Sequence, residues 1–270
     1  MRSTISFVSK MNIHQNEYNV QEEFLQHRST LESYLYRLCG NREDAKDLVH
    51  DTYLKAVSNF DSFKGNSTFK TWVFAIATNL AKDNYRVQKR WPLNAQDLCR
   101  NATESDVEKH DRIISAFESQ SEPSFDIVEH MNYCFTCMAK NLTLQQQIAL
   151  ILKEIYQFKR NEIASILQMT EGVVKHLLFE ARKELQEKYE KRCALINKNG
   201  PCYQCAELND YLSPAADSFQ KLDNLKLPSD LQGHFRKRFS LISKINPLTD
   251  NGALLEDTIM RILNEAIASD

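Results

Sequence analysis

The stretch that decides the fold spans residues 60–83 and reads FDSFKGNSTFKTWVFAIATNLAKD. It begins with a polar turn around Gly65, after which Ser67 is placed to cap a helix. Apolar side chains then recur at helical spacing, which predicts a helix that runs to about Arg90. The side chains expected on its buried face are Phe69, Trp72, Val73, Ile76 and Leu80.

A polar stripe follows another side of the same predicted helix. Asn79, Lys82 and Arg86 are spaced 3 and 4 residues apart, so they share one face. An amide and cations in a line suit contacts to the phosphates and bases of a DNA strand. The alternative is that basic residues gather at a helix C-terminus because the helix dipole favours them there. On this segment alone the two interpretations weigh about equally.

An acidic stripe characterises the preceding segment. Residues 42–57 read REDAKDLVHDTYLKAV, and their apolar positions predict an amphipathic helix. Asp44, Asp47 and Asp51 lie at helical spacing on the opposite side. From the residues alone, a solvated face is the favoured interpretation of this stripe.

Residues 143–192 have the pattern of a helix-turn-helix. Thr143 and Gln146 predict a capping box, and a short helix is expected over 160–167. Thr170 would cap the next helix, which runs to about Arg192 and carries Lys175, Phe179 and Arg182 along its outward line. A basic second helix suits the major groove of DNA, whereas the alternative is an ordinary three-helix bundle.

These patterns predict an all-α protein with five segments. They are an N-terminal tail (1–20), a first helical domain (21–95), an acidic linker (96–127), a helix-turn-helix domain (128–192) and a cysteine-containing extension (193–270). The linker is proposed because nine acidic residues against three basic ones fall between residues 96 and 129. In the extension, helices are expected over 229–245 and 253–268. We expect the extension to pack on the helix-turn-helix domain and to have a regulatory role.

Composition narrows the class of protein. The chain has 270 residues and a formal net charge of -2, and it contains no apolar run long enough to cross a bilayer. The N-terminus lacks the apolar core of a secretory signal, so a cytoplasmic location without membrane insertion is expected. The near-neutral net charge of the chain gives no reason to expect a nucleic-acid partner. The distribution of the charge into basic blocks and an acidic linker does give such a reason.

Seven cysteines are the unusual feature of the composition, and their odd number suits a reducing compartment. Two C-x2-C pairs are a pattern typical of zinc ligands. Three interpretations remain open: a zinc site, a redox-active thiol pair, or inert cysteines. The candidate metal ligands are Cys134, Cys137, Cys193, Cys202 and Cys205.

Taken together, residues 42–57, 60–83 and 142–175 resemble a known family, the bacterial sigma factors of the extracytoplasmic-function type (group IV of the sigma-70 superfamily). The resemblance covers residues 21–192, and its first block is highly specific. It implies a non-catalytic factor that binds core RNA polymerase, recognises the promoter minus-10 and minus-35 elements and promotes DNA melting. No cofactor is required by this function.

The resemblance also implies a role for individual residues. Asp44, Asp47 and Asp51 would bind the clamp helices of the polymerase β′ subunit. The minus-10 contacts would be Lys70, Trp72, Asn79, Lys82, Asp83 and Arg86. The minus-35 contacts would be Arg160, Thr170, Lys175, His176, Phe179 and Arg182. The polymerase β flap and an anti-sigma factor are further partners, and the linker would extend toward the RNA exit channel.

The chain departs from the family pattern in its recognition helix, where Leu177 and Glu180 replace two expected arginines. Fewer cations predict weaker and less salt-dependent minus-35 binding. Two rival functions fit the sequence less well. A plain helix-turn-helix repressor has no need of the block over 42–86, and an enzyme would need a catalytic constellation that the scattered histidines do not form.

Overall fold

The computed structural model describes residues 3–85, 91–92, 94–118, 127–193, 231–249 and 253–268. Every regular element in these ranges is a helix, which confirms the all-α prediction. The elements in chain order are α1 (Ser3–Cys39), α2 (Arg42–Ser58), the short η1 (Phe60–Ser62), α3 (Phe69–Tyr85), α4 (Ala95–Glu104), α5 (Val107–Glu118), α6 (Ile127–Ala139), α7 (Leu144–Glu154), α8 (Arg160–Leu167), α9 (Glu171–Arg192), α12 (Leu231–Ile242) and α13 (Ala253–Ala268).

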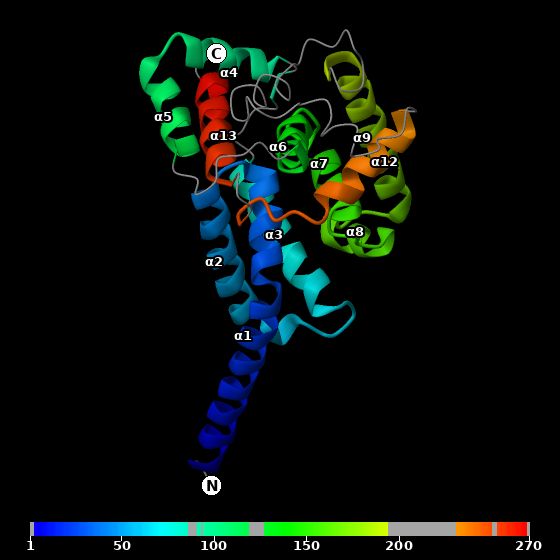
Figure 1. Ribbon diagram of the computed structural model, residues 1–270. Coiled ribbons are helices and arrows are strands. Elements are labelled where there is room, and N and C mark those ends of the chain that lie inside the picture. The colour runs from blue at the N-terminus through cyan, green and yellow to red at the C-terminus, as the bar shows by residue number, and fades with distance from the viewer. Residues whose placement is uncertain are drawn as a thin grey trace.

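Helices α1, α2 and α3 pack together as the first domain. Helix α1 begins at Ser3, so the expected N-terminal tail is largely continuous with it, and its first turns extend from the body (Figure 1). Gly40 then turns the chain with a φ of 65°, a backbone conformation that glycine adopts without strain. The Asn41 side chain caps α2 by accepting hydrogen bonds from the backbone N–H groups of Glu43 and Asp44.

Helices α6 to α9 form the second domain, in which α7, α8 and α9 pack on one another. The predicted capping box is confirmed, because Thr143 and Gln146 each bond the other's backbone N–H. The short helix α8 ends at Leu167, and the φ of 56° at the next residue, Gln168, reverses the chain. Thr170 then accepts a hydrogen bond from the backbone N–H of Val173 and caps α9, as predicted. The helix-turn-helix therefore follows from local signals.

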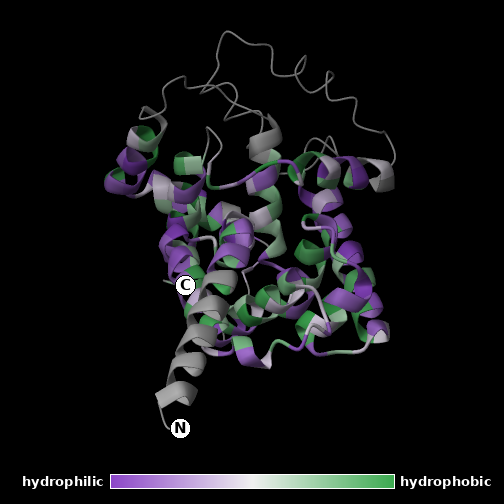
Figure 2. Ribbon diagram, turned by 90° about the horizontal axis from the view of Figure 1, so that it is seen from below, coloured by the Kyte–Doolittle hydropathy of each residue, from purple (hydrophilic) through white to green (hydrophobic). Residues whose placement is uncertain are grey.

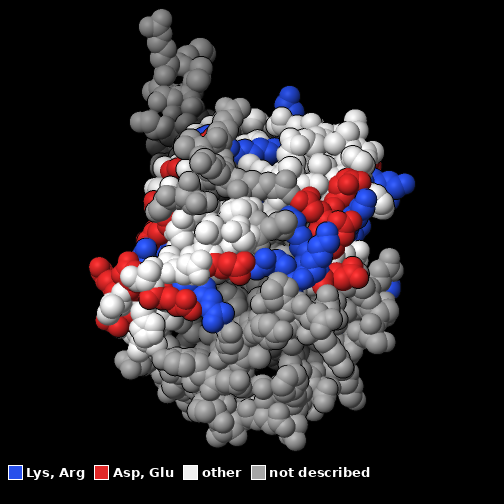
Figure 3. All heavy atoms as spheres, turned by 90° about the horizontal axis from the view of Figure 1, so that it is seen from above, with Lys and Arg blue, Asp and Glu red and all other residues white. Residues whose placement is uncertain are grey.

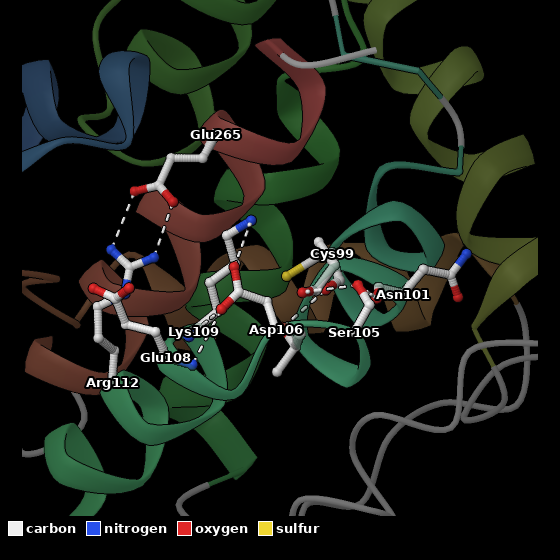
Figure 4. A network of polar contacts seen from close by, with 10 residues as sticks. Cys99, Asn101, Ser105, Asp106, Glu108, Lys109, Arg112 and Glu265 are labelled. Atoms are coloured by element: carbon white, nitrogen blue, oxygen red, sulfur yellow. Dashed lines mark hydrogen bonds and ion pairs between the residues drawn. The ribbon is translucent and has the colours of Figure 1, made fainter.

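The acidic segment between the two domains, which was predicted as a linker, contains α4 and α5. Both helices pack on α13, which lies beside them in Figure 1. Arg112 of α5 forms a bidentate ion pair with Glu265 of α13, with nitrogen–oxygen distances of 2.9 and 3.2 Å (Figure 4). The two predicted helices of the extension begin and end close to their predicted limits. Helix α12 packs on α6 and α9 of the second domain, and α13 shares a buried apolar cluster with Tyr133 and Cys137 of α6.

One continuous apolar core joins the two domains. It includes Tyr34 and Leu35 from α1, Phe74 from α3, and Ile148 and Ile151 from α7. In Figure 2 the apolar faces of the helices turn toward one another and the polar faces turn outward. Among the described helices, none has an apolar stretch of the length that a bilayer requires. The packing of the two domains against each other was not predicted.

Candidate nucleic-acid interface

The acidic stripe of α2 is accessible over most of its length. Asp47 and Asp51 are exposed, whereas Asp44 is half-buried near the start of the helix. Burial raises the pKa of the Asp44 carboxyl, and the negative charge of Asp47 adds to this rise. The two exposed carboxylates can therefore meet a cationic partner without any rearrangement of the helix.

A groove lies beside this stripe, between α1 and α2, and it was missed in the sequence. Its volume is about 260 Å³, and its lining includes Phe24, Arg28, Lys46, His50 and Tyr53. Leu25 also lines the groove and is 55% exposed. An apolar position facing outward from a helix is the signal that could have revealed the groove.

The start of α3 differs from the prediction. Thr68, and not Ser67, caps the helix, because the Thr68 hydroxyl accepts a hydrogen bond from the backbone N–H of Thr71 at 3.1 Å. The turn before it is packed by aromatic rings: the Trp72 ring centroid lies 5.1 Å from that of Phe63 and 5.7 Å from that of Phe69. Trp72 is therefore half-buried in this aromatic cluster.

The predicted buried face of α3 was wrong in part. Val73 is buried, but Phe69, Trp72, Ile76 and Leu80 are only partly buried. The most buried side chains are instead Thr71, Val73, Phe74, Ala77, Thr78 and Ala81. The physical reason is that α3 contacts α1 and α2 on one side and α8 on another, so a second face is covered.

The polar stripe of α3 is placed at the edge of this packed surface. Asn79 and Lys82 are half-buried, Asp83 is exposed, and Arg86 lies outside the described residues. Burial lowers the pKa of the Lys82 ammonium, and the neighbouring Asp83 carboxylate opposes that shift. A partly desolvated cation favours an anionic ligand, because a bound phosphate would pair with the charge and accept its hydrogen bonds in place of water.

Lys70, at the start of α3, has a different environment. Its ammonium lies over the ring of Phe158, 4.6 Å from the centroid, and 5.9 Å from the centroid of Phe74. Such cation–aromatic contacts are favourable and partly satisfy the charge. The structure thus separates Lys70 from the outward stripe of Asn79 and Lys82.

The outward face of α9 carries most of the residues that were predicted there. Lys175, His176 and Phe179 are exposed, and the Phe179 side chain is 61% exposed. Val173, which was not selected from the sequence, is also exposed on this helix. Arg160 is exposed at the start of α8, and the cap residue Thr170 is exposed before α9.

Arg182 does not share this accessibility. Its guanidinium forms an ion pair with Glu154 of α7, with Nε 2.9 Å from the carboxylate oxygen Oε1. The prediction of an outward cation at this position therefore needs correction, because a carboxylate 28 residues earlier in the chain neutralises the charge of Arg182.

Charge elsewhere on the surface is mixed, and Figure 3 shows acidic and basic side chains interspersed over the described part of the upper face.

The cysteines are divided by the fold. Cys137 is buried against Trp91, Ala95 and Cys99, whereas Cys134 is only half-buried. Cys193 follows α9 and accepts a hydrogen bond from the Arg238 guanidinium at 3.4 Å. Cys202 and Cys205 lie outside the described residues. Within the described ranges, no three histidine, cysteine or acidic side chains are grouped as a metal site would require.

Comparison with known proteins identifies the two domains. The family model of Sigma-70 region 2 matches residues 24–90, and that of Sigma-70 region 4 matches residues 133–185. The ECF RNA polymerase sigma-E factor of Haemophilus influenzae is 30% identical over 156 residues, which are 56% of this chain and 77% of that protein. The chain belongs to the extracytoplasmic-function sigma factors. It is a transcription initiation factor and not an enzyme.

Other relatives of this sigma factor are similar over the same part of the chain. ECF RNA polymerase sigma factor SigW of Bacillus subtilis is 30% identical over 154 residues, which cover 56% of this chain and 79% of that protein. Sigma factor RpoE of Bartonella quintana, solved in complex with the anti-sigma factor NepR, is 24% identical with a TM-score of 0.44, covering 64% of this chain and 97% of that one. Region 2 corresponds to α1–α3 and region 4 to α6–α9, so the two family regions end before the extension.

Proposed function

We propose that this sigma factor binds core RNA polymerase through α2 and directs it to promoters by reading two DNA elements. The observation that carries the proposal is the presence of both family regions, with the acidic stripe of α2 and the outward face of α9 exposed for partners. Asp47 and Asp51 would contact the β′ clamp helices, with Asp44 at the edge of the contact. The adjoining groove, with its exposed Leu25, would add apolar contact area.

The minus-10 contacts are proposed for α3. Asn79, Lys82 and Arg86 would hold the phosphates and bases of one strand, since cations on one helix face follow a nucleic-acid backbone. Melting needs a base to leave the stack, and aromatic side chains stabilise such a base. Trp72 and Phe69 of α3, with Phe63 just before the helix, would supply such rings. Lys70 and Asp83 would border the site.

The minus-35 contacts are proposed for the first turns of α9. Lys175 would contact a phosphate, whereas the exposed ring of Phe179 suits an apolar contact with a thymine methyl group in the major groove. His176, Thr170 and Arg160 would contact the backbone or base edges nearby. Arg182 would take part only after it leaves Glu154. The β flap would bind the second domain, and an anti-sigma factor would compete for the same surfaces.

The remaining proposals concern cofactors and location. Zinc bound by some of the five candidate cysteines would be structural, because the function requires no metal. A cytoplasmic location follows from the function, since the polymerase and its promoters are there. A metal assay on the purified full chain tests the zinc proposal, and less than one zinc ion in ten chains would exclude it.

Reconstituted transcription tests the main proposal. The purified chain is mixed with bacterial core polymerase and a library of promoter fragments, and transcripts are sequenced from their start sites. We expect starts that share two upstream elements, with permanganate-reactive thymines around the minus-10 element. If the chain binds DNA by itself and does not bind core polymerase, the proposal fails and the protein is a helix-turn-helix repressor.

A further inference from the structure

The two DNA-reading domains of this chain are closed onto each other. The Thr71 hydroxyl of α3 lies 3.4 Å from the carboxylate oxygen of Glu162 in α8, to which it donates a hydrogen bond. The Phe74 ring centroid lies 4.9 Å from that of Phe158, the residue that also covers Lys70. Tyr156 packs edge-on against Tyr34 of α1, with 5.7 Å between the ring centroids. The contact is therefore built from buried side chains of both domains.

This closed arrangement conflicts with the proposed reading of a promoter. The minus-10 and minus-35 elements are about 25 base pairs apart by their positions, which is roughly 85 Å at about 3.4 Å per base pair. Helices α3 and α8 are in contact, so the domains that would read the elements cannot reach both at once. The inference that follows rests on the proposed function, because only DNA binding requires the domains to separate.

Arg37 is the residue at which the closed arrangement is joined to the extension. It lies on α1 and is fully buried, with an exposed fraction of 0%. Its guanidinium donates to the Asn132 side chain on α6 and to the backbone carbonyl oxygens of Ile242 and Ile245, at 3.4 and 2.9 Å. One buried side chain thus links the first domain, the second domain and the end of α12.

The rest of the extension makes contacts on both sides of Arg37. On the second domain, Phe239 packs against Phe135, with 5.3 Å between ring centroids, and the Arg238 guanidinium lies 5.0 Å from the centroid of Tyr189. On the first domain, Arg42 donates to the Leu248 carbonyl at 3.2 Å. The extension therefore bridges the two domains.

Helix α13 extends the bridge to the segment between the domains. Its Met260, Ile262 and Leu263 are buried in one cluster with Trp91 and Cys137. Trp91 lies before α4, and Cys137 lies in α6 of the second domain. The ion pair between Arg112 and Glu265 fixes α5 to the outer side of α13 (Figure 4). The acidic segment between the domains, which contains α4 and α5, would have to extend for the domains to separate. Its helices are packed on α13 of the extension.

We propose that α12, residues 243–249 and α13 are an intramolecular clamp that holds the two DNA-binding domains closed, and that binding to core polymerase and promoter requires its release. A partner that binds only the open form shifts the population toward it by its differential affinity. The apparent affinity of the partner is its affinity for the open form multiplied by the fraction of chains that are open. Weakening the clamp raises this fraction and so strengthens polymerase binding. If the extension only stabilised the fold, substitutions in it would leave the affinity for core polymerase unchanged or lower it.

The test uses three full-length clamp variants and one matched control. Ile242→Ala removes a side chain that is 1% exposed at the end of α12, Arg37→Met removes the buried guanidinium, and Asn132→Ala removes one of its acceptors. The control, Leu185→Ala, removes a fully buried side chain of similar size from α9 of the second domain. Circular dichroism checks that helix content is kept. Small-angle scattering measures the radius of gyration, and fluorescence anisotropy measures the affinity for core polymerase.

We expect the clamp variants that keep their helix content to have a larger radius of gyration than the wild type. They should bind core polymerase about five-fold more tightly or better, within the usual range of coupling between sites. The control should increase neither the radius of gyration nor the affinity for core polymerase. Folded clamp variants with wild-type dimensions would overturn the proposal. So would expanded variants that bind core polymerase no more tightly than a wild type that does bind it. If the variants expand but neither they nor the wild type binds core polymerase, the proposed function fails and the clamp remains.

Discussion

The ammonium group of Lys70 lies 4.6 Å from the centroid of the Phe158 ring, so a cation of the first domain is covered by an aromatic residue of the second. The family regions assign the two residues to separate DNA-binding units. Their contact means that part of the predicted minus-10 surface is in use inside the chain. Asn79 and Lys82 are half-buried and Asp83 is exposed, so this part of the predicted surface is the better target for mutation.

Reversing two charges on α2 should remove polymerase binding. In Asp47→Lys with Asp51→Lys, the exposed carboxylates become cations that repel a cationic partner, and we expect at least a tenfold loss of affinity for core polymerase. The stability should change by no more than about 0.5 kcal/mol per site, because both positions are exposed. Anisotropy titration measures the affinity and thermal unfolding the stability. Asp61→Lys, at another exposed acidic position, is the control, and equal losses in both would refute the assignment.

Alanine at Asn79, Lys82 and Arg86 should separate transcription from polymerase binding. The triple variant lacks the proposed minus-10 contacts but keeps α2, so we expect no promoter opening and wild-type affinity for core polymerase. Permanganate reactivity and anisotropy titration measure the two quantities. Alanine at Lys55, Asn84 and Lys244, which are exposed, removes one amide and two cations elsewhere and should leave both quantities unchanged. Transcription that survives in the first variant would show that the minus-10 site lies elsewhere.

Lys175 and Arg182 should differ in their effect on the salt dependence of DNA binding. An exposed lysine that contacts a phosphate contributes about 0.9 to the slope of log affinity against log salt, and Lys175→Ala should lower the slope by about that amount. Arg182→Ala should lower it less, because Glu154 already neutralises Arg182, and should instead cost up to about 1 kcal/mol of stability for a half-exposed pair. Holoenzyme titrations at several salt concentrations measure the slopes. Equal slopes for the two variants would contradict the ion pair.

Lys140 should give the stability a distinctive pH dependence. Burial lowers the pKa of its ammonium from 10.5 to about 8, where Nζ donates to the Leu38 carbonyl at 2.9 Å. Between these pH values the unfolded chain binds more protons than the folded chain, so the Lys140 contribution to the free energy of unfolding rises with pH. The ionised ammonium therefore disfavours the fold below pH 8.

The comparison with Lys140→Met isolates this contribution, because other titrating groups affect both proteins. We expect the difference in the free energy of unfolding to change in favour of the wild type as the pH rises from 7 to 10, by up to about 3 kcal/mol. Denaturant unfolding at a series of pH values measures it. A difference that is independent of pH would contradict the lowered pKa.

Several elements could be predicted because their signals are local. Helix α8 spans 160–167 as expected, and Thr143, Gln146 and Thr170 cap the helices that they were predicted to cap. A cap and a repeat of apolar side chains involve residues within one or two turns of each other, so the printed order of residues contains the necessary information. The acidic stripe of α2 was visible for the same reason.

What the sequence by itself determined is therefore most of the helices, the order of the two domains and their family. The tertiary structure alone decided which faces remain available. Arg182 is neutralised by Glu154, Lys70 is covered by Phe158, and Arg37 joins three separate segments within one buried site. These partners are 28 to 208 residues apart in the chain. Periodicity reports which face of a helix is apolar, but not which distant surface will cover it, because that depends on shape and charge complementarity in the folded chain.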